Sequence, residues 1–375
     1  MNIQPFLLER IQSLYENTVE YNLTESGFHP FTLQELLTTD ELDMIQNTVL
    51  GYGQTNGSIP LRELIADLYE PCDREQILVT NGSAEANFVA CRTLLEKGDE
   101  VIMMIPNYMQ MWGIAEEMGC HLKAFHLLEE NNWAPDLDEL EQLATPATKM
   151  IVICNPNNPT GYTLSSAEIQ RIVAIAQKND AWIFSDEIYR GAELNGVEIE
   201  SFYGKYDKVM VNGGLSKAYA LPGLRLGWLA GPSEVIEDSW GYHDYTSITA
   251  GILSHKIGEI ALQPVKRLEI LNRNRKMLNE NLVVLQEWLA KKGDFFHFIP
   301  PKAGGMSFVR YHAPGVNSTA LSDWIRLNKS VFIVPGDCYG MDGYFRLGIG
   351  ERKAFLLKGL ELLREGIEEY LALNQ

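Results

Sequence analysis

The chain has 375 residues, of which 46% are hydrophobic and 22% are charged. This is the composition of a folded protein, and the length favours two domains. The 50 acidic and 31 basic residues give a formal charge of −19, which disfavours nucleic acid and anionic membranes as partners.

Residues 1–45 form a segment that is too short to build a core of its own, so we expect it to pack on a smaller domain. The segment lacks the basic start and apolar run of a signal peptide, and no apolar stretch in the chain reaches the ~20 residues of a membrane span. The five cysteines are scattered and include no C-x-x-C pair, which argues against disulfides and structural zinc. We therefore expect a cytoplasmic protein without a membrane segment.

Residues 46–262 have the sequence pattern of a large α/β domain. Short apolar runs alternate there with helical patterns, and this alternation predicts a mainly parallel sheet sandwiched by helices. The predicted strands are residues 76–80, 100–105, 121–127, 149–154, 181–185, 208–212 and 224–230. The predicted helices are residues 84–95, 109–118, 138–144 and 165–178.

In residues 263–375 the sequence pattern changes to that of an α+β fold, which predicts a small C-terminal domain. A long charged amphipathic helix is expected at residues 266–292, and a final helix at residues 352–373. Between these helices the predicted strands are residues 295–299, 306–310 and 331–334.

Polar and reactive side chains follow four of the predicted strands. They are Ser83 and Ala84 at a helix start, the loop NPNNPTG at residues 155–161, Asp186 with Tyr189, and Ser216 with Lys217 and Arg225. Each feature alone has a plain structural explanation, because Gly-Ser starts usually cap helices and loop lysines are usually solvated. Ligands bind beyond the carboxyl ends of parallel strands, however, so the combination indicates one ligand site.

The same segments carry a family resemblance. The loop NPNNPTG, the segment SDEIY at residues 185–189 and LSKAYALPGLRLGW at residues 215–228 resemble the class I/II aminotransferases of the fold-type I pyridoxal-phosphate (PLP) enzymes. Further similar segments are YGQTNGSIPLR at residues 52–62, Pro106-Asn107-Tyr108 and YFRL at residues 344–347. The resemblance thus runs from about residue 50 to residue 350 and implies a PLP-binding large domain.

The resemblance also implies the catalytic roles. Lys217 would form a Schiff base with PLP and then move the Cα proton of the substrate. Asp186 would pair with the protonated pyridine nitrogen, which makes the ring an electron sink. Tyr189 and Asn158 would donate hydrogen bonds to the ring oxygen and tune the Schiff-base pKa.

Binding roles follow in the same way. The residues expected to hold the phosphate are Ser83, Ala84, Ser216 and Arg225. Tyr108 would stack on the ring, and Tyr52 would reach the phosphate of a neighbouring subunit, which implies a homodimer with shared active sites. Arg346 would bind the substrate α-carboxylate with its two-pronged guanidinium, and Asn158 and Gly27 would also contact substrate.

Two positions depart from the family pattern. Gly214 stands where the family often has a serine that binds phosphate, so we expect lower phosphate affinity or a water in its place. Residues 24–30 (TESGFHP) replace the usual Gly-x-Pro loop, so Gly27 is an uncertain match and the substrate side chain stays open. Glu25 in this loop raises the hypothesis of a cationic substrate side chain, and a solvated Glu25 is the competing explanation.

The resulting prediction is a PLP-dependent aminotransferase that moves the amino group of an L-amino acid to a 2-oxo acid. A β-lyase, cyclase or synthase could use the same residues, although lyases of this fold tend to have histidine at the Tyr189 position. A non-catalytic PLP-binding protein is a third alternative. No metal is expected, because His121 and His126 would face opposite sides of a strand. The donor, the acceptor and the pathway are left open.

Overall fold

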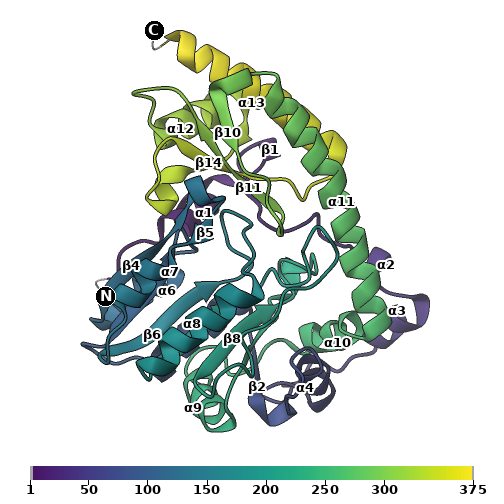
Figure 1. The fold of residues 1–375 in the computed structure, drawn as a ribbon. Helices are drawn as coiled ribbons and strands as arrows, with labels where there is room; N and C mark the ends of the chain where they lie inside the picture. Colours follow the sequence, from purple (N-terminus) through teal and green to yellow (C-terminus); the bar gives the residue numbers. More distant parts are fainter. Residues whose placement is uncertain (1–2, 374–375) are drawn as a thin grey trace.

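The computed structural model describes residues 3–373, which fold around an eight-stranded, mainly parallel sheet (Figure 1). The strands are β2 (Ile77–Thr80), β3 (Glu100–Ile105), β4 (His121–Leu128), β5 (Ala134–Pro135), β6 (Thr148–Cys154), β7 (Trp182–Asp186), β8 (Val209–Gly214) and β9 (Gly227–Ala230). Their order is β2-β9-β8-β7-β6-β3-β4-β5. Strands β8, β7, β6, β3 and β4 pair in parallel, whereas β9 runs antiparallel to both of its neighbours. The predicted mainly parallel sheet is confirmed.

Both faces of this sheet are buried, which explains the nearly continuous apolar runs. In β3, Val101 and Met103 join one hydrophobic cluster, and Ile102 and Met104 join the other. The helices of this part of the chain are α4 (Ile59–Ala66), α5 (Ser83–Leu94), α6 (Gln110–Met118), α7 (Leu137–Leu143), α8 (Ser166–Lys178), α9 (Ser233–His243) and α10 (Ile252–Ala261). Successive residues of a strand point to opposite faces, so a run apolar at every position needs cover on both sides.

A smaller antiparallel sheet lies in the C-terminal part, at the top of Figure 1. Its order is β10-β11-β14-β13. The elements here are α11 (Pro264–Ala290), β10 (Phe296–Phe298), β11 (Met306–Tyr311), α12 (Ser318–Lys329), β12 (Val331–Phe332), β13 (Val334–Pro335), β14 (Tyr344–Gly348) and α13 (Lys353–Leu373). The short 3-10 helices of the chain are η1 (Arg74–Gln76), η2 (Glu129–Asn131), η3 (Pro222–Leu224), η4 (Gly293–Phe295) and η5 (Gly336–Tyr339).

Two predicted strands were wrong in extent. The expected strand at 224–230 begins only at Gly227, because η3 precedes it and Arg225 takes a left-handed φ of 49°. The expected strand at 331–334 is two short strands in different sheets. Strand β12 pairs with the N-terminal strand β1 (Tyr21–Asn22), whereas β13 pairs with β14.

The N-terminal segment contacts both parts of the molecule. Besides β1 it contains α1 (Leu7–Tyr15), α2 (Leu33–Leu36) and α3 (Thr39–Gln46). Strand β1 attaches it to β12, and Figure 1 draws α2 and α3 beside α10 and α11. The domain division at residues 45 and 262 stays a prediction. Within residues 3–373, no helix is long and apolar enough to cross a membrane, and no group of metal-binding side chains occurs.

Candidate active site

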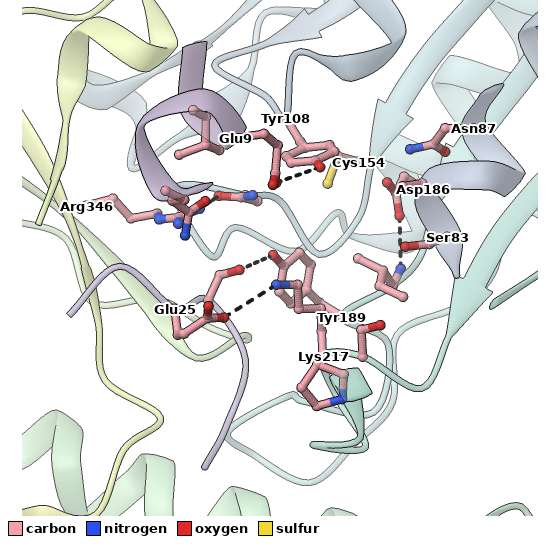
Figure 2. A pocket seen from close by; sticks show the side chains of 18 of the residues that line it. Glu9, Glu25, Ser83, Asn87, Tyr108, Cys154, Asp186, Tyr189, Lys217 and Arg346 are labelled. Carbon is pink, nitrogen blue, oxygen red and sulfur yellow. Dashed lines mark hydrogen bonds and ion pairs between the residues drawn. The ribbon is translucent and has the colours of Figure 1, made fainter. Parts of the chain in front are cut away.

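A cavity of about 280 Å³ lies at the carboxyl ends of the parallel strands, where the N-terminal and C-terminal segments meet the large sheet. The predicted site residues that line it are Ser83, Ala84, Tyr108, Asn158, Asp186, Tyr189, Ser216, Lys217, Arg225 and Arg346. In Figure 2, Asp186 and Ser83 lie on one side of the cavity and Arg346 lies on the opposite side, with Lys217 and Tyr189 between them. The structure therefore brings together side chains that are far apart in the sequence.

The start of α5 forms one end of the cavity. Gly82 has a φ of 88°, and a Cβ there would lie 2.3 Å from Nη2 of Arg225. Gly227 lets β9 approach just as closely, since a Cβ would lie 2.4 Å from the backbone N of Ser83. No side chain caps α5, so its first N–H groups face the cavity together with Arg225, whose Nη1 donates to Oγ of Ser216 at 3.3 Å. Helix N-termini of this kind favour phosphate.

Asp186 ends β7 and is buried beside this helix start. Its Oδ1 accepts a hydrogen bond from the backbone N of Ile188 at 3.1 Å. Burial raises the pKa of the Asp186 carboxyl to about 6, against the lowering effect of that bond, of Asn87 and of Lys217. A buried carboxylate with no cation bonded to it is suited to a cationic ligand atom.

Lys217 follows β8 and reaches into the middle of the cavity. Its Nζ lies 3.9 Å from Oε2 of Glu25. Tyr189 stands beside it and donates from Oη to Oγ of Ser26 at 2.8 Å. Burial raises the pKa of the Tyr189 phenol, so this group stays protonated and available as a donor.

In the loop NPNNPTG, two asparagines hold the loop in shape and a third lines the cavity. Asn157 is held inside the loop, with its Oδ1 accepting from the backbone N of Thr160 at 3.1 Å. Asn155 accepts from the backbone N of Leu164 at 3.0 Å. These bonds fix the loop and leave Asn158 to line the cavity.

Arg346 on β14 forms the far end of the cavity and is only 1% exposed. Its Nη1 donates to Oδ1 of Asn158 at 2.8 Å, and its Nη2 donates to the backbone O of Thr24 at 2.5 Å. Its Nε is buried without a hydrogen-bond partner among the described residues. Buried donors are usually hydrogen-bonded, so a free Nε on a cavity-lining arginine suits an acceptor atom of a ligand.

Two predicted site residues do not line the cavity. Tyr52 is 88% exposed in the loop before α4, so within one chain it reaches no part of the site. Gly27 lies just outside the cavity lining. A Cβ at this position would come within 3.3 Å of the backbone O of Ser216 and 3.6 Å of Cδ of Lys217. Gly27 therefore shapes the backbone around Lys217.

Gly214, where the family often has serine, has no room for a side chain. A Cβ would lie 2.9 Å from Cδ1 of Ile188, 3.0 Å from the backbone O of Leu226 and 3.1 Å from Cα of Gly227. The glycine thus reflects close packing of β8 against β9. A serine ligand at this position would require the backbone to move.

Several cavity residues were missed by sequence reasoning. Helix α1 contributes Glu9 and Gln12, Glu16 follows at its C-terminal end, and Ser26 and Asn87 come from elsewhere in the chain. Positions 9, 12 and 16 recur at helical spacing, which is a signal for one face, but an acidic helix face is usually only solvated. Asn87 is held by Gln110 and Asn212 beneath Asp186, and no short motif marks it.

Comparisons with known proteins cover almost the whole chain. A family model described as aminotransferase class I and II matches residues 22–355. The chain is 27% identical over 351 residues to capreomycidine synthase of Streptomyces vinaceus, covering 92% of this chain and 89% of that protein. It is 28% identical over 323 residues to aspartate aminotransferase of Pyrococcus horikoshii, covering 84% and 82%. A solved PLP-dependent aminotransferase from Streptococcus suis 89-1591 matches with a TM-score of 0.92, 34% identity and 99% of each chain.

Proposed function

Because the chain belongs to the aminotransferase class I and II family, we propose that it transfers the amino group of an L-amino acid to a 2-oxo acid. Pyridoxal 5'-phosphate is the cofactor that this membership implies. The observation that supports the proposal most is a single cavity lined by Lys217, Asp186 and Arg346.

The residues of the cavity fit this cofactor. The uncapped start of α5 at Ser83 and Ala84, with Ser216 and Arg225, suits its phosphate, and the absent Cβ at Gly82 leaves the space that Arg225 occupies. The buried Asp186 carboxylate suits a protonated pyridine nitrogen. When bound, the cofactor supplies an electron sink that acidifies the Cα proton of an attached amino acid.

The side chains of the chain itself would then do the following. Arg346 binds the substrate carboxylate and orients the amino acid, with Asn158 beside it. Lys217 would hold the cofactor through Nζ, and its amine would accept and return the Cα proton of the substrate. Tyr108 stacks on the ring and excludes water, and Tyr189 donates from Oη to the ring oxygen.

We also propose a homodimer in the cytoplasm, engaged in amino acid metabolism. Tyr52 and its chain neighbours Val49 and Leu50 are strongly exposed, at 88%, 85% and 77%, and Tyr245 is 91% exposed. A surface of this kind suits an interface between copies, and Tyr52 would then reach the phosphate of the neighbouring site. All five cysteines are free, in keeping with a reducing compartment. Sedimentation that gives the mass of one chain would contradict the dimer.

The test of the proposed reaction is a panel of amino donors against several 2-oxo acids, with purified PLP-loaded protein. With catalytic amounts of protein, we expect more than one equivalent of donor per cofactor to become a 2-oxo acid only when an acceptor 2-oxo acid is present, and the donor consumed should equal the acceptor converted. Release of pyruvate and ammonia without any 2-oxo acid would instead show a β-lyase. A protein that binds PLP but converts no amine would be a non-catalytic PLP-binding protein.

A second candidate is a cyclase or synthase reaction at the same lysine. The match to capreomycidine synthase over 92% of this chain favours it specifically. Such a reaction rearranges one substrate and consumes no amino acceptor. Mass spectrometry of each donor, incubated alone with catalytic amounts of protein, separates the two candidates. A new product that keeps the α-amino nitrogen supports the synthase.

A further inference from the structure

One wall of the cavity carries three carboxylates. Glu9 on α1 and Glu16 at its C-terminal end line the cavity, and Glu25 joins them from the loop after β1. We call these three residues the acidic wall. Figure 2 shows Glu9 and Glu25 on the N-terminal segment, on the side opposite Asp186.

The acidic wall is poorly neutralised by the protein. Glu9 accepts a hydrogen bond from Oη of Tyr108 at 2.8 Å, which adds no positive charge. Glu25 lies 3.9 Å from Nζ of Lys217, a distance at the outer limit of an ion pair, and its side chain is 47% exposed. No ion pair of Glu9 or Glu16 occurs among residues 3–373.

The carboxylates of the wall also repel one another. Burial and then the charges of Glu25 and Glu9 raise the pKa of Glu16, and only Lys217 acts against them. Like charges held close in a partly closed cavity destabilise the ionised state until a cation enters. The free wall is therefore a better cation site than a solvated surface of the same charge.

The other charges of the cavity already have counterparts in the proposed function. Arg225 and the start of α5 take the phosphate, Asp186 takes the ring nitrogen, and Lys217 carries the cofactor. Arg346 has a buried Nε without a hydrogen-bond partner among residues 3–373, and this donor suits an acceptor atom of a ligand such as a carboxylate oxygen. An α-carboxylate at Arg346 leaves the acidic wall as the charged surface available to the rest of the substrate.

We propose that the preferred amino donor is an L-amino acid with a cationic side chain, which the acidic wall binds while Arg346 binds its α-carboxylate. The inference rests on the proposed function, because it names the substrate class of the same site. Charge-assisted hydrogen bonds to Glu16 and Glu25 would supply the recognition. The wall belongs to the N-terminal segment, and it borders the proposed cofactor residues where Glu25 approaches Lys217 and Glu9 accepts a hydrogen bond from Tyr108.

The experiment compares L-arginine with L-citrulline, which has nearly the same shape but no side-chain charge. The PLP-loaded enzyme is mixed rapidly with each amino acid, and the shift in cofactor absorbance that precedes amino transfer gives the dissociation constant. Amino transfer is then followed by product analysis. A hydrogen bond to a charged group contributes roughly 1.5–3 kcal/mol, so we expect arginine to bind about 10-fold to 100-fold more tightly.

Substitutions in the acidic wall test whether it causes the preference for arginine over citrulline. In Glu16→Gln and Glu25→Gln the arginine-to-citrulline ratio should fall severalfold, and in the double variant it should approach one. Glu20→Gln is the matched control, because it removes the same charge from the same segment outside the cavity lining, and its ratio should stay at the wild-type value. Raising the salt concentration should lower the wild-type ratio.

The outcomes separate the two proposals. Equal binding of arginine and citrulline, or no binding of either, overturns the inference. Transfer from leucine or aspartate without preference for arginine does so as well, and leaves the proposed reaction standing. Tight, wall-dependent binding of arginine without amino transfer keeps the wall as the binding site of a cationic side chain, but it overturns both the proposed reaction and the assignment of that amino acid as the donor. Lysine and ornithine show whether the wall selects any cation or only a guanidinium.

Discussion

The two ends of the cavity are built in different ways. The end with Ser83, Asp186 and Lys217 consists of residues at the end of β7 or shortly after β2 and β8, and its backbone is closely packed. The end with the acidic wall comes from a segment that is attached by the two-residue strand β1 and by α1. Residues at strand ends inherit the rigidity of the sheet, whereas residues on a short attached segment can change without disturbing it.

We expect this contrast to separate the residues that carry out the reaction from the residues that select the substrate. If the proposed function holds, substitutions at the sheet end should abolish turnover or strain the fold, and substitutions at the wall should change substrate preference. The following predictions test that division, beginning with the largest effect.

Lys217→Ala should cause the largest loss. Removing the amine removes the covalent attachment and the proton carrier together, so we expect turnover to fall by at least about 10³-fold. Borohydride reduction followed by mass spectrometry should fix PLP to the wild-type chain and not to the variant. Full activity in the variant would end the assignment of Lys217.

Asp186→Asn should lower turnover by roughly 10²-fold or more and yet stabilise the cofactor-free protein. Burial raises the pKa of this carboxyl from 3.8 to about 6, so its contribution to stability is present below pH 4 and is lost as the pH rises through 6. The variant should therefore exceed the wild type by up to about 3 kcal/mol above pH 6, with little difference near pH 4. Urea unfolding at several pH values measures this. An equal difference at all pH values would contradict the buried-charge explanation.

Gly214→Ser should destabilise the protein by about 1–3 kcal/mol, because its Cβ would approach backbone atoms of Leu226 and Gly227. Gly231→Ala is the matched control. It is also buried, but its Cβ would meet the nearest atom, the backbone O of Val209, at an ordinary 3.4 Å. Urea midpoints for both variants provide the measurement, and an unchanged midpoint in Gly214→Ser would remove the packing argument.

Ser26→Ala should have the smallest effect on stability, since it removes only one hydrogen bond. That bond joins Ser26 of the N-terminal segment to Tyr189 after β7. Loss of the acceptor for Oη of Tyr189 should destabilise the cofactor-free protein by about 1 kcal/mol. The PLP-loaded protein should lose less, because Tyr189 then donates to the cofactor. Thermal melts of both forms provide the comparison. Equal losses would show that Tyr189 keeps Ser26 as its partner when PLP is bound.

The sheet end of the site was predictable because its residues follow regular strands. Parallel strands with both faces buried produce the apolar runs of β3, β6 and β7, and a residue such as Asp186 at the end of a run has only one edge of the sheet to occupy. The left-handed Arg225 was not foreseeable in the same way. Local apolarity extended the predicted strand through it, and tertiary packing of η3 decided otherwise.

The acidic wall was not predicted as a unit, for a physical reason. Glu9 on α1 and Glu16 at its C-terminal end lie on one face, and the pairing of β1 with β12, which joins Tyr21 to Val331, helps to place that face over the cavity. Pairing between distant segments depends on the whole core, so no local pattern encodes it. The division of residues 331–334 between two sheets was not predicted for the same reason.

The attachment of the N-terminal segment has an evolutionary consequence. The 21 residues from the start of α1 at Leu7 through Gly27 contain the acidic wall and the backbone oxygen that accepts a hydrogen bond from Arg346, and they contain no strand of the large sheet. Recombination or drift confined to this stretch could retarget the enzyme while the catalytic scaffold is inherited intact. Grafting residues 7–27 between relatives of this fold is therefore a direct way to transplant substrate choice, and ancestral lineages could have diversified by the same exchange.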